Sequence, residues 1–215
     1  MLDVKQVGLI AYRDGEAMQR DYWERRTRDE IGDTLLLLEH PPVITLGVRK
    51  QSADDVLLSP ELLHARGIEL VKTDRGGLAT LHAPGQIVGY FFVRLNGWLG
   101  GLRGFINVLQ EGLIRCCADF GVNAHPDDTE PGIWVDGGEG ESPRKIASLG
   151  LSVRRQVSRH GFGLNVNTDL SLFETLNPCG HPSSVMTTLS REAQKELPLE
   201  EVMSSLERQF LELFQ

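Results

Sequence analysis

The sequence predicts a single α+β domain over residues 1–215. Segments 145–154 and 161–167 alternate apolar and polar side chains across a short polar connection, which predicts an antiparallel hairpin. Segments 102–120 and 199–213 carry apolar residues at helical spacing. The length of 215 residues suits one substantial core and is short for two full domains.

Helix and strand patterns follow one another in the first part of the chain. Residues 15–28 are polar and charged with a thin apolar stripe at Met18 and Tyr22, which predicts a surface helix. The apolar run 34–38 predicts a strand buried on both faces. Two prolines end it, because proline cannot extend a central ladder, and residues 43–46 predict another short strand.

The middle of the chain predicts a strand followed by a packing helix. Residues 86–95 are rich in Ile, Val, Tyr and Phe, which favour strands. The helix over 102–120 is followed by Gly121, a suitable C-terminal cap. Cys117 lies on its apolar face with Cys116 beside it, so we expect both cysteines to pack in the core rather than react.

The third cysteine has different surroundings. Ser171 and Glu174 have the spacing of a capping box, which predicts a short helix beginning near Ser171 and ending before Asn177 and Pro178. Cys179 then falls on a turn after this helix. Because a turn exposes its side chains, we expect the Cys179 thiol to be accessible.

Composition excludes several classes of protein. Hydrophobic residues make up 40% and charged residues 24% of the chain, as in ordinary globular proteins. No apolar run reaches the roughly 18–20 residues of a membrane span, and the N-terminus has no signal-peptide pattern. Three cysteines, two of them adjacent, form no disulfide framework, so we expect a cytoplasmic protein without membrane contact. The formal charge of −8 argues against nucleic acid as a partner.

Common nucleotide and metal motifs are missing from the sequence. It contains neither a P-loop nor a dinucleotide-binding glycine fingerprint. It has no H-E-x-x-H pattern, and its six histidines lie far apart, so we expect no metal and no cofactor. The glycine-rich segment 137–143 is acidic and is expected to be a flexible surface loop, not a phosphate cradle.

Three segments carry residues suited to covalent acyl chemistry. Cys179 stands in Asn-Pro-Cys-Gly, and the thiolate is the nucleophilic form of cysteine. Lys145 opens the run 145–150, and a nearby ammonium favours the thiolate at neutral pH. The segment 75–86 is dense in glycine and carries one arginine and one histidine, as expected of a loop wrapped around a substrate.

The residues alone leave the catalytic base open. Lys145 is one candidate, and histidine is the usual base beside a cysteine nucleophile. His82, His160 and His181 are therefore candidates as well. An unreactive exposed thiol at Cys179 is the alternative.

Five motifs together resemble those of the octanoyl (lipoyl) transferase family, in the family's order, from about residue 34 to residue 189. They are Glu39-His40-Pro41-Pro42-Val43-Ile44-Thr45-Leu46-Gly47, Arg75-Gly76-Gly77 through His82-Ala83-Pro84-Gly85-Gln86, Lys145 to Gly150, His160 to Asn167 and Asn177-Pro178-Cys179-Gly180. Each motif alone is weak, but their joint occurrence is specific.

The resemblance implies a fold and a reaction. The fold is similar to that of biotin and lipoate protein ligases, with a mixed β-sheet flanked by helices and a smaller sheet at its side. The reaction moves an octanoyl or lipoyl group from acyl carrier protein to a lysine of a lipoyl domain. By position, Cys179 is the acyl-thioester nucleophile, and Lys145 lowers the pKa of Cys179 and later accepts a proton. The positions that match the family's substrate-binding segments are Arg75, Gly76, Gly77, Leu78, Ala79, Thr80, Leu81, His82, Ser148, Leu149, Gly150, Gly161, Phe162 and Gly163.

The sequence departs from the family pattern at Leu81, where an aromatic residue is usual, and at Ala83, where glycine is usual. Both border His82, so the departures bear on pocket shape and preferred chain length. The main rival is an ATP-dependent lipoate or biotin ligase on the same fold, which would not need Cys179. A second rival is a catalytically silent protein that binds lipoyl domains.

The resemblance also implies the partners. The donor is octanoyl-acyl carrier protein, and the acceptors are the lipoyl domains of 2-oxoacid dehydrogenases and the glycine cleavage protein. These partners are typically acidic, so a chain of net charge −8 needs a local basic surface to meet them. Basic residues cluster at Arg25 and Arg26 with Arg28, at Arg49 with Lys50, and at Arg154 and Arg155 with Arg159. The candidates for docking are Arg154 with Arg155 and Arg49 with Lys50, and ordinary solvated side chains are the alternative.

Overall fold

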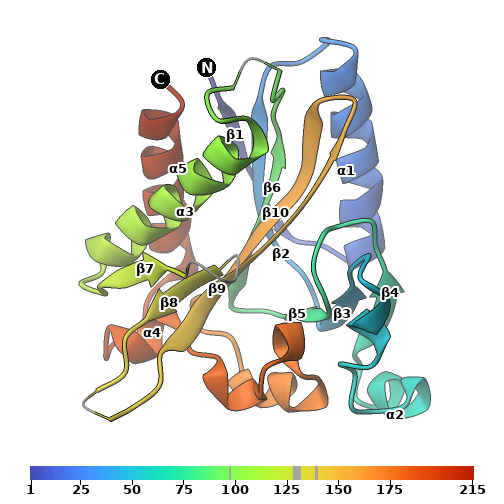
Figure 1. Ribbon diagram of the computed structural model, residues 1–215, viewed down its shortest axis with the longest axis vertical. Helices are drawn as coiled ribbons and strands as arrows, with labels where there is room; N and C mark the ends of the chain where they lie inside the picture. The colour runs from blue at the N-terminus through green and yellow to red at the C-terminus, as the bar shows by residue number, and fades with distance from the viewer. Residues whose placement is uncertain (97, 128–131, 139) are drawn as a thin grey trace.

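The computed structural model describes residues 1–96, 98–127, 132–138 and 140–215, and for Cys179 the backbone alone. A large β-sheet runs through the molecule with helices on both sides, and a smaller sheet stands beside its lower end (Figure 1). This is the α+β arrangement that the sequence predicts.

Within the described residues, the larger sheet has seven strands in the order β1-β2-β6-β10-β9-β8-β7. The strands are β1 (Asp3–Leu9), β2 (Thr34–Glu39), β6 (Gln86–Phe92), β7 (Ala124–Pro126), β8 (Gly132–Val135), β9 (Arg144–Arg154) and β10 (Val157–Asn165). Strands β1 and β2 are parallel, and the other neighbours are antiparallel, so the sheet is mixed. The smaller sheet orders its strands β4-β3-β5, with β3 at Val43–Leu46, β4 at Glu69–Lys72 and β5 at Thr80–His82.

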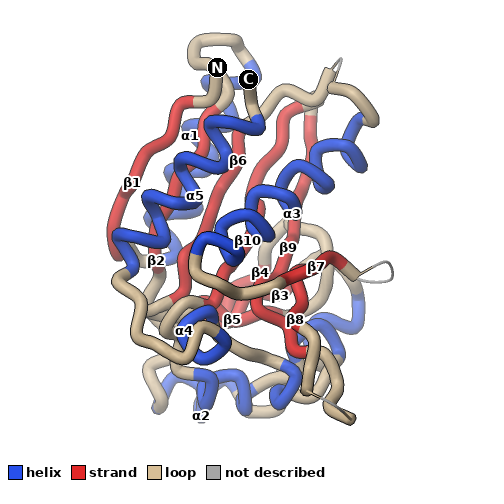
Figure 2. Tube along the Cα trace, turned by 90° about the vertical axis from the view of Figure 1, so that its left-hand side faces the viewer, coloured by secondary structure: helices blue, strands red, loops and turns tan. Residues whose placement is uncertain are grey.

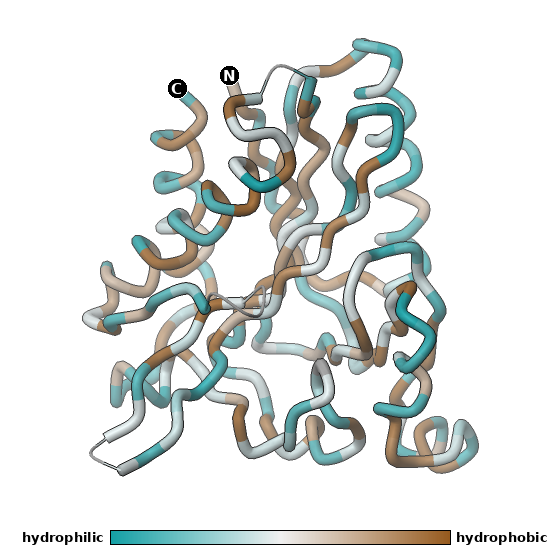
Figure 3. The backbone as a smooth tube through the Cα atoms, viewed as in Figure 1, coloured by the Kyte–Doolittle hydropathy of each residue, from teal (hydrophilic) through white to brown (hydrophobic). Residues whose placement is uncertain are grey.

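Helices cover both faces of the larger sheet. Helices α3 (Gly101–Asp119) and α5 (Leu199–Leu213) lie on one face, and α1 (Tyr12–Thr27) lies on the other (Figure 2). Figure 3 shows that α1 is mostly hydrophilic along its length, as predicted for a surface helix. The short helix α2 (Pro60–Ala65) packs near β4. Further short helices in the described residues are η1 (Lys50–Ala53), which follows β3, and η2 (Leu170–Thr175), η3 (Pro178–Gly180), η4 (Ser183–Val185) and α4 (Leu189–Glu192), which precede α5.

The leucine run in β2 is buried because both faces of the sheet are covered. Leu35 and Leu37 pack in the core beneath α3 and α5, and Leu36 and Leu38 pack in the core beneath α1. All four side chains are fully buried. The prediction of a strand buried on both faces is confirmed.

The predicted hairpin is formed by β9 and β10. Arg155 and Gln156 connect the strands, and both have positive φ, 49° and 61°. This is the backbone of a type I′ turn, whose twist matches that of a strand pair, although asparagine and glycine are its usual residues. The C-terminal helix α5 has the predicted bounds.

The predicted short helix is confirmed in its position, but the capping box does not form. The segment forms the 3₁₀-helix η2, which begins at Leu170, and the cap is Asp169, whose carboxylate accepts a hydrogen bond from the backbone N–H of Ser171. The Asp169 carboxylate therefore accepts the hydrogen bond from the Ser171 N–H that Glu174 would accept in a capping box. Cys179 lies on the predicted turn, the 3₁₀-helix η3 (Pro178–Gly180).

Helix α3 confirms the core assignment of two cysteines. Cys116 and Cys117 are fully buried between α3, α5 and the sheet. Gly121 follows the helix with φ of 79°, as a C-terminal cap requires. Part of the acidic segment 137–143, at residue 139, lies outside the described residues. In the ranges that the structure describes, no helix is long and apolar enough to cross a membrane.

The contact between α3 and α5 depends on Gly112. A Cβ built at Gly112 overlaps the ring of Phe210, which packs directly on the α3 backbone. We expect Gly112→Ala to destabilise the protein by about 1–3 kcal/mol, the usual cost of overpacking a core. Urea denaturation measures this, with Arg103→Ala at an exposed position of α3 as the control. Equal stability of the two variants would contradict the packing argument.

Candidate active site

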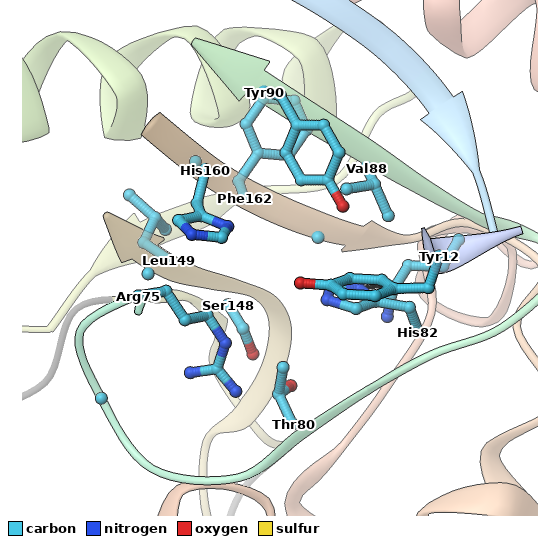
Figure 4. Close-up of a pocket in the computed structure, with 15 residues that line it drawn as sticks. Tyr12, Arg75, Thr80, His82, Val88, Tyr90, Ser148, Leu149, His160 and Phe162 are labelled. Carbon is cyan, nitrogen blue, oxygen red and sulfur yellow. Dashed lines mark hydrogen bonds between the residues drawn. The ribbon is translucent and has the colours of Figure 1, made fainter. Parts of the chain in front are cut away.

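A pocket lies between the hairpin β9–β10, strands β5 and β6, and the loop 73–79 (Figure 4). Ten of the fourteen predicted substrate-binding positions line it: Arg75, Gly77, Thr80, His82, Ser148, Leu149, Gly150, Gly161, Phe162 and Gly163. Segments that are 60 to 90 residues apart in the chain therefore meet at one cavity.

Four predicted positions lie outside the described lining of the pocket: Gly76, Leu78, Ala79 and Leu81. The alternation of a strand explains Leu81. Thr80 and His82 face the pocket from β5, so Leu81 between them faces the opposite way. Leu81 and Ala83 are fully buried in a separate apolar cluster with Leu63 and Phe173. Both departures from the family pattern therefore pack in the core behind the pocket.

The described lining includes five residues that the sequence analysis did not assign to substrate binding: Tyr12, Gln86, Val88, Tyr90 and His160. Tyr12 comes from the first turn of α1, and its hydroxyl points into the cavity (Figure 4). Local sequence gives no signal that the start of this helix reaches the pocket. Gln86 and His160 lie within the motifs that resemble the family, and this is the sequence signal that could have placed them in the pocket.

The loop 73–79 is held over the pocket by its own backbone. The N–H of Gly76 donates to the carbonyl of Leu151 at 2.8 Å, and the N–H of Val48 donates to the carbonyl of Arg75 at 3.0 Å. A Cβ at Gly47 would overlap the carbonyl of Gly77. The glycines of this segment thus allow a close backbone approach, which larger residues would block.

Arg75 is buried in the wall of the pocket. Its guanidinium donates to the Thr45 carbonyl at 2.6 Å, to the Thr45 hydroxyl at 2.9 Å and 3.1 Å, and to the Gly76 carbonyl at 3.1 Å. The stem of Arg75 lies against Gly150, where a Cβ would come within 3.2 Å of its Cδ. These contacts fix the arginine along the inner face of the loop.

Lys145 is a buried lysine, with 1% of its surface exposed. Its side chain crosses the backbone of Gly132, where a Cβ would come within 2.6 Å of the lysine Cε. Strand β9 is irregular opposite Ile133 and Trp134, so that Gly132 pairs with Ser148 and Trp134 pairs with Lys145. Ile146 is the extra, unpaired residue of this bulge in β9. It puts Lys145 on the same face of the strand as Ser148, toward the pocket.

Trp134 connects Lys145 with the segment of Cys179. The Lys145 Nζ lies 5.1 Å from the centre of the Trp134 ring, and the His181 ring meets the same indole at 5.9 Å, edge to face. The indole N–H of Trp134 is buried, and it has no hydrogen-bond partner in the described parts of the chain. A buried donor of this kind can donate a hydrogen bond to an oxygen atom of a bound molecule.

The turn Pro178–Gly180 is fixed at both ends. The N–H of Asn177 donates to the carbonyl of Asp55 at 2.7 Å, and the N–H of Gly180 donates back to the carbonyl of Asn177 at 3.0 Å. A Cβ at Gly180 would lie 3.8 Å from the Leu78 side chain. The turn that carries Cys179 therefore borders the glycine loop. The Cys179 side chain lies outside the described part of the structure.

A hydrogen-bonded chain of side chains joins the pocket to the strand of Lys145. His82 Nδ1 lies 2.6 Å from Gln86 Oε1, and Gln86 Nε2 donates to Asn165 Oδ1 at 2.8 Å. The Asn165 amide donates to the Thr187 carbonyl at 3.2 Å. The Thr187 N–H in turn donates to the Lys145 carbonyl at 3.0 Å.

These hydrogen bonds fix the tautomer of His82. Gln86 Nε2 also donates to the Leu81 carbonyl at 3.1 Å, so the amide oxygen must face His82 and accept from it. His82 Nδ1 then carries the proton and Nε2 is unprotonated. Burial lowers the pKa of His82 to about 3, with His40 nearby as the next cause. His82 is therefore neutral at physiological pH.

The other histidine candidates have separate surroundings. His160 Nε2 lies 2.8 Å from a carboxylate oxygen of Asp74, and His181 contacts Trp134 beside the turn. The core cysteines are unsuited to nucleophilic attack, because burial raises the pKa of Cys116 to about 12 and raises that of Cys117 further. In the described residues, no group of three or more His, Cys, Asp or Glu side chains is placed to hold a metal ion.

The two candidate basic clusters differ in their surroundings. The carboxylate of Asp74 lies 3.7 Å from the Arg154 guanidinium, and Arg155 stacks over Trp23 at 5.8 Å. Arg49 and Lys50 are exposed, and the N–H of Arg49 donates to the carbonyl of Gly77 at 3.4 Å. The second cluster thus borders the glycine loop, and the first occupies the distant turn of the hairpin.

Comparison with known proteins identifies similar sequences over the full chain. A family model described as the lipoyl protein ligase A/B catalytic domain matches residues 11–211. An octanoyltransferase of Acidobacterium capsulatum is 41% identical, over 100% of this chain and 90% of its own length. An octanoyltransferase of Maridesulfovibrio salexigens is 38% identical, over 97% of this chain and 94% of its own.

Solved structures share the fold at low identity. A bipartite lipoate protein ligase of Thermoplasma acidophilum aligns with a TM-score of 0.73 at 13% identity, covering 99% of this chain and 83% of the other. A biotin protein ligase of Aquifex aeolicus aligns with a TM-score of 0.54 at 11% identity, covering 100% and 69%. The fold with its smaller side sheet matches the expectation from the resemblance.

The buried neutral state of His82 predicts a pH dependence of stability. An unfolded histidine binds a proton below about pH 6.5, and the folded His82 does so only near pH 3. The free energy of unfolding should therefore fall as the pH falls through this window, with about 2 kcal/mol lost between pH 7 and pH 5 through this group. We expect His82→Gln to lose correspondingly less stability than the wild type over that range.

Urea denaturation at both pH values measures this difference, and His64→Gln at an exposed position is the control. If His82→Gln and the wild type lose the same stability, His82 is not the buried neutral group described above.

Proposed function

The chain belongs to the lipoyl protein ligase A/B catalytic domain family, and we propose that it is an octanoyltransferase that works through a thioester on Cys179. The full-length similarity to octanoyltransferases supports the transfer of octanoyl groups in protein lipoylation. The cysteine mechanism is our interpretation of the residues around the pocket.

One observation carries this proposal. A buried lysine, Lys145, lies beside the pocket and is joined through Trp134 to the segment of the Cys179 turn. A lysine shielded from water at such a place offers either a charge for a thiolate or a base for an incoming amine. The pocket beside it has the glycine-rich walls that a narrow acyl chain needs.

In the first half of the reaction, the Cys179 thiolate attacks the carbonyl carbon of the donor thioester. The Lys145 ammonium stabilises the thiolate before attack. The oxyanion of the tetrahedral intermediate is stabilised by N–H groups at the Pro178–Gly180 turn or near Leu149, with the unpartnered indole N–H of Trp134 as a further donor. The carbon–sulfur bond to the carrier then breaks, and the carrier thiolate takes a proton from the Lys145 ammonium as it leaves, which makes Lys145 neutral.

In the second half, a lysine amine of the acceptor attacks the octanoyl-Cys179 thioester. Neutral Lys145 accepts a proton from that amine, and Cys179 leaves as the thiolate. The product is an amide on the acceptor. Because a thioester is already activated for this transfer, no ATP is consumed.

We propose octanoyl-acyl carrier protein as the donor. The acceptors are then the lipoyl domains of 2-oxoacid dehydrogenases and of the glycine cleavage protein. The cytoplasm, which keeps thiols reduced, is the compartment that suits Cys179. Arg49 and Lys50, exposed beside the glycine loop, are better placed for acidic partners than Arg154, which lies near Asp74.

Incubation of the protein with octanoyl-acyl carrier protein, without ATP, tests the proposal by intact-mass spectrometry. We expect an octanoyl-sized adduct that hydroxylamine releases, as it releases thioesters. Peptide mapping should place the adduct on Cys179, because Cys116 and Cys117 are fully buried and their thiols have raised pKa values. Cys179→Ala should form no adduct.

An adduct on Cys117 would overturn the mechanism. Transfer that requires free octanoate and ATP would instead favour a ligase. A Cys179→Ala variant that keeps its biological function would favour a binding protein without catalysis.

The two roles of Lys145 are separable by substitution. Lys145→Arg keeps a positive charge but cannot act as a base, since a guanidinium is not deprotonated in proteins. We expect the acyl-enzyme to form slowly and then to persist when lipoyl domain is added. Overall turnover should fall roughly 10²–10⁴-fold, the usual contribution of a general base.

Lys145→Met, which removes the charge as well, should also slow formation of the acyl-enzyme. Single-turnover mass spectrometry separates the two steps, and Lys72→Arg at an exposed position is the control. Normal turnover by Lys145→Arg would leave the lysine a purely electrostatic role.

A further inference from the structure

The two ends of the pocket differ in exposure. The end near the Pro178–Gly180 turn borders the partly exposed Leu78 and the exposed Gly180, so it is the mouth. Along the hairpin, Ser148 pairs with Gly163, Gly150 with Gly161 and Leu151 with His160. His160 therefore lies at the end of the pocket opposite Lys145.

The end at His160 is closed by buried residues. The backbone N–H of His160 donates to the amide oxygen of Gln19 on α1 at 3.2 Å, and Gln19 is fully buried. The Tyr90 hydroxyl lies 2.7 Å from His40 Nε2, and His40 Nδ1 lies 2.8 Å from the Ile10 carbonyl. Tyr90 thus donates to His40, which in turn donates to the backbone. These partners all lie outside the cavity.

His160 has an unusual backbone at this place. Its φ is 60°, a left-handed conformation that few residues other than glycine adopt. Its side chain is 95% shielded from solvent, and its ring meets the Tyr90 ring edge to face, with centres 6.2 Å apart. Figure 4 shows His160 and Tyr90 as neighbours, with Tyr12 across the cavity beside His82.

Asp74 holds the His160 ring in position. One carboxylate oxygen lies 2.8 Å from His160 Nε2, and the other lies 3.1 Å from Arg159 Nη1 and 3.7 Å from Arg154 Nη2. The hydrogen bond from His160, with these arginines, lowers the pKa of Asp74 to about 2, so Asp74 remains a carboxylate. Asp74 directly precedes Arg75, whose stem forms the adjacent wall.

The spacing along the hairpin matches a chain of about eight carbons. From Gly163 to His160 the strand advances three residues, about 10 Å at 3.3 Å per residue. Seven carbon–carbon bonds of about 1.5 Å, drawn out in a zigzag, span about 9 Å. A longer chain would meet the rings of His160 and Tyr90, and their hydrogen bonds prevent those rings from turning aside.

We propose that the Asp74–His160 pair is a length stop that limits the acyl group to about eight carbons. Asp74 is a positioning residue, which acts by fixing the His160 ring at the closed end. This inference rests on the proposed acyl transfer. It assigns a role in chain-length specificity to two residues that the sequence analysis did not assign to substrate binding.

The test compares kcat/KM for octanoyl-, decanoyl- and dodecanoyl-acyl carrier protein. His160→Asn shortens the side chain and keeps a residue that tolerates positive φ. Asp74→Asn keeps the ring and weakens its restraint. We expect each variant to lower the preference for octanoyl over dodecanoyl at least tenfold, since one methylene at a closed pocket end changes selectivity about 10–200-fold.

Asp119→Asn is the matched control. Asp119 also accepts hydrogen bonds from three side chains, Ser205, Arg208 and Gln209, but it joins α3 to α5 away from the pocket. This variant should lose stability and keep the wild-type chain-length preference. If either folded pocket variant lowers transfer of all three chains in equal proportion, the length stop is refuted.

The outcomes separate this inference from the proposed function. If the wild type transfers no acyl chain of any length, the proposed function fails. If it transfers octanoyl groups and the preference is the same in the wild type, His160→Asn and Asp74→Asn, only the length stop fails. Circular dichroism identifies a variant that does not fold, and the other variant then decides.

Discussion

The site depends on the close approach of the loop 73–79 to the β9–β10 hairpin. Glycine at 47, 77 and 150 lets backbone and the Arg75 stem meet where a Cβ would overlap or press on them. The N–H of Gly76 then reaches the Leu151 carbonyl, and Asp74 reaches His160. With larger residues the loop would lift from the hairpin, and the pocket would be an open groove that water fills. Such packing would shield the thioester of the proposed reaction from water.

The same construction ties the pocket to the reacting groups. Strand β9 contributes both the Lys145 side chain and the pocket wall at Ser148, because an irregularity in its pairing with β8 turns both residues to one face. The hydrogen bonds that run from His82 through Asn165 reach Thr187, whose backbone N–H donates to the Lys145 carbonyl. The fold thus holds a buried lysine and a neutral histidine, which reduce stability, where the proposed chemistry would use them.

Local patterns predicted the elements whose own residues decide their structure. The β2 leucines, the hairpin and helix α5 each follow from periodicity and burial within one segment. Contacts between distant segments decided the rest. The placement of Tyr12 in the pocket depends on the packing of α1, and the orientation of Leu81 depends on β5 joining a separate sheet. The capping box failed because Asp169, outside the pattern, competes for the same N–H.

The fold alone does not separate an acyl transferase from an ATP-dependent ligase, because both bind an acyl chain in the same kind of pocket. The difference lies in how the acyl carbonyl is activated. A ligase must place a nucleotide phosphate at the carboxylate, whereas a transferase needs a nucleophile there. In this chain the turn Pro178–Gly180 is fixed by Asp55 and borders Leu78, and Trp134 joins its flank to Lys145. A cysteine turn beside a buried lysine is what the proposed thioester exchange requires.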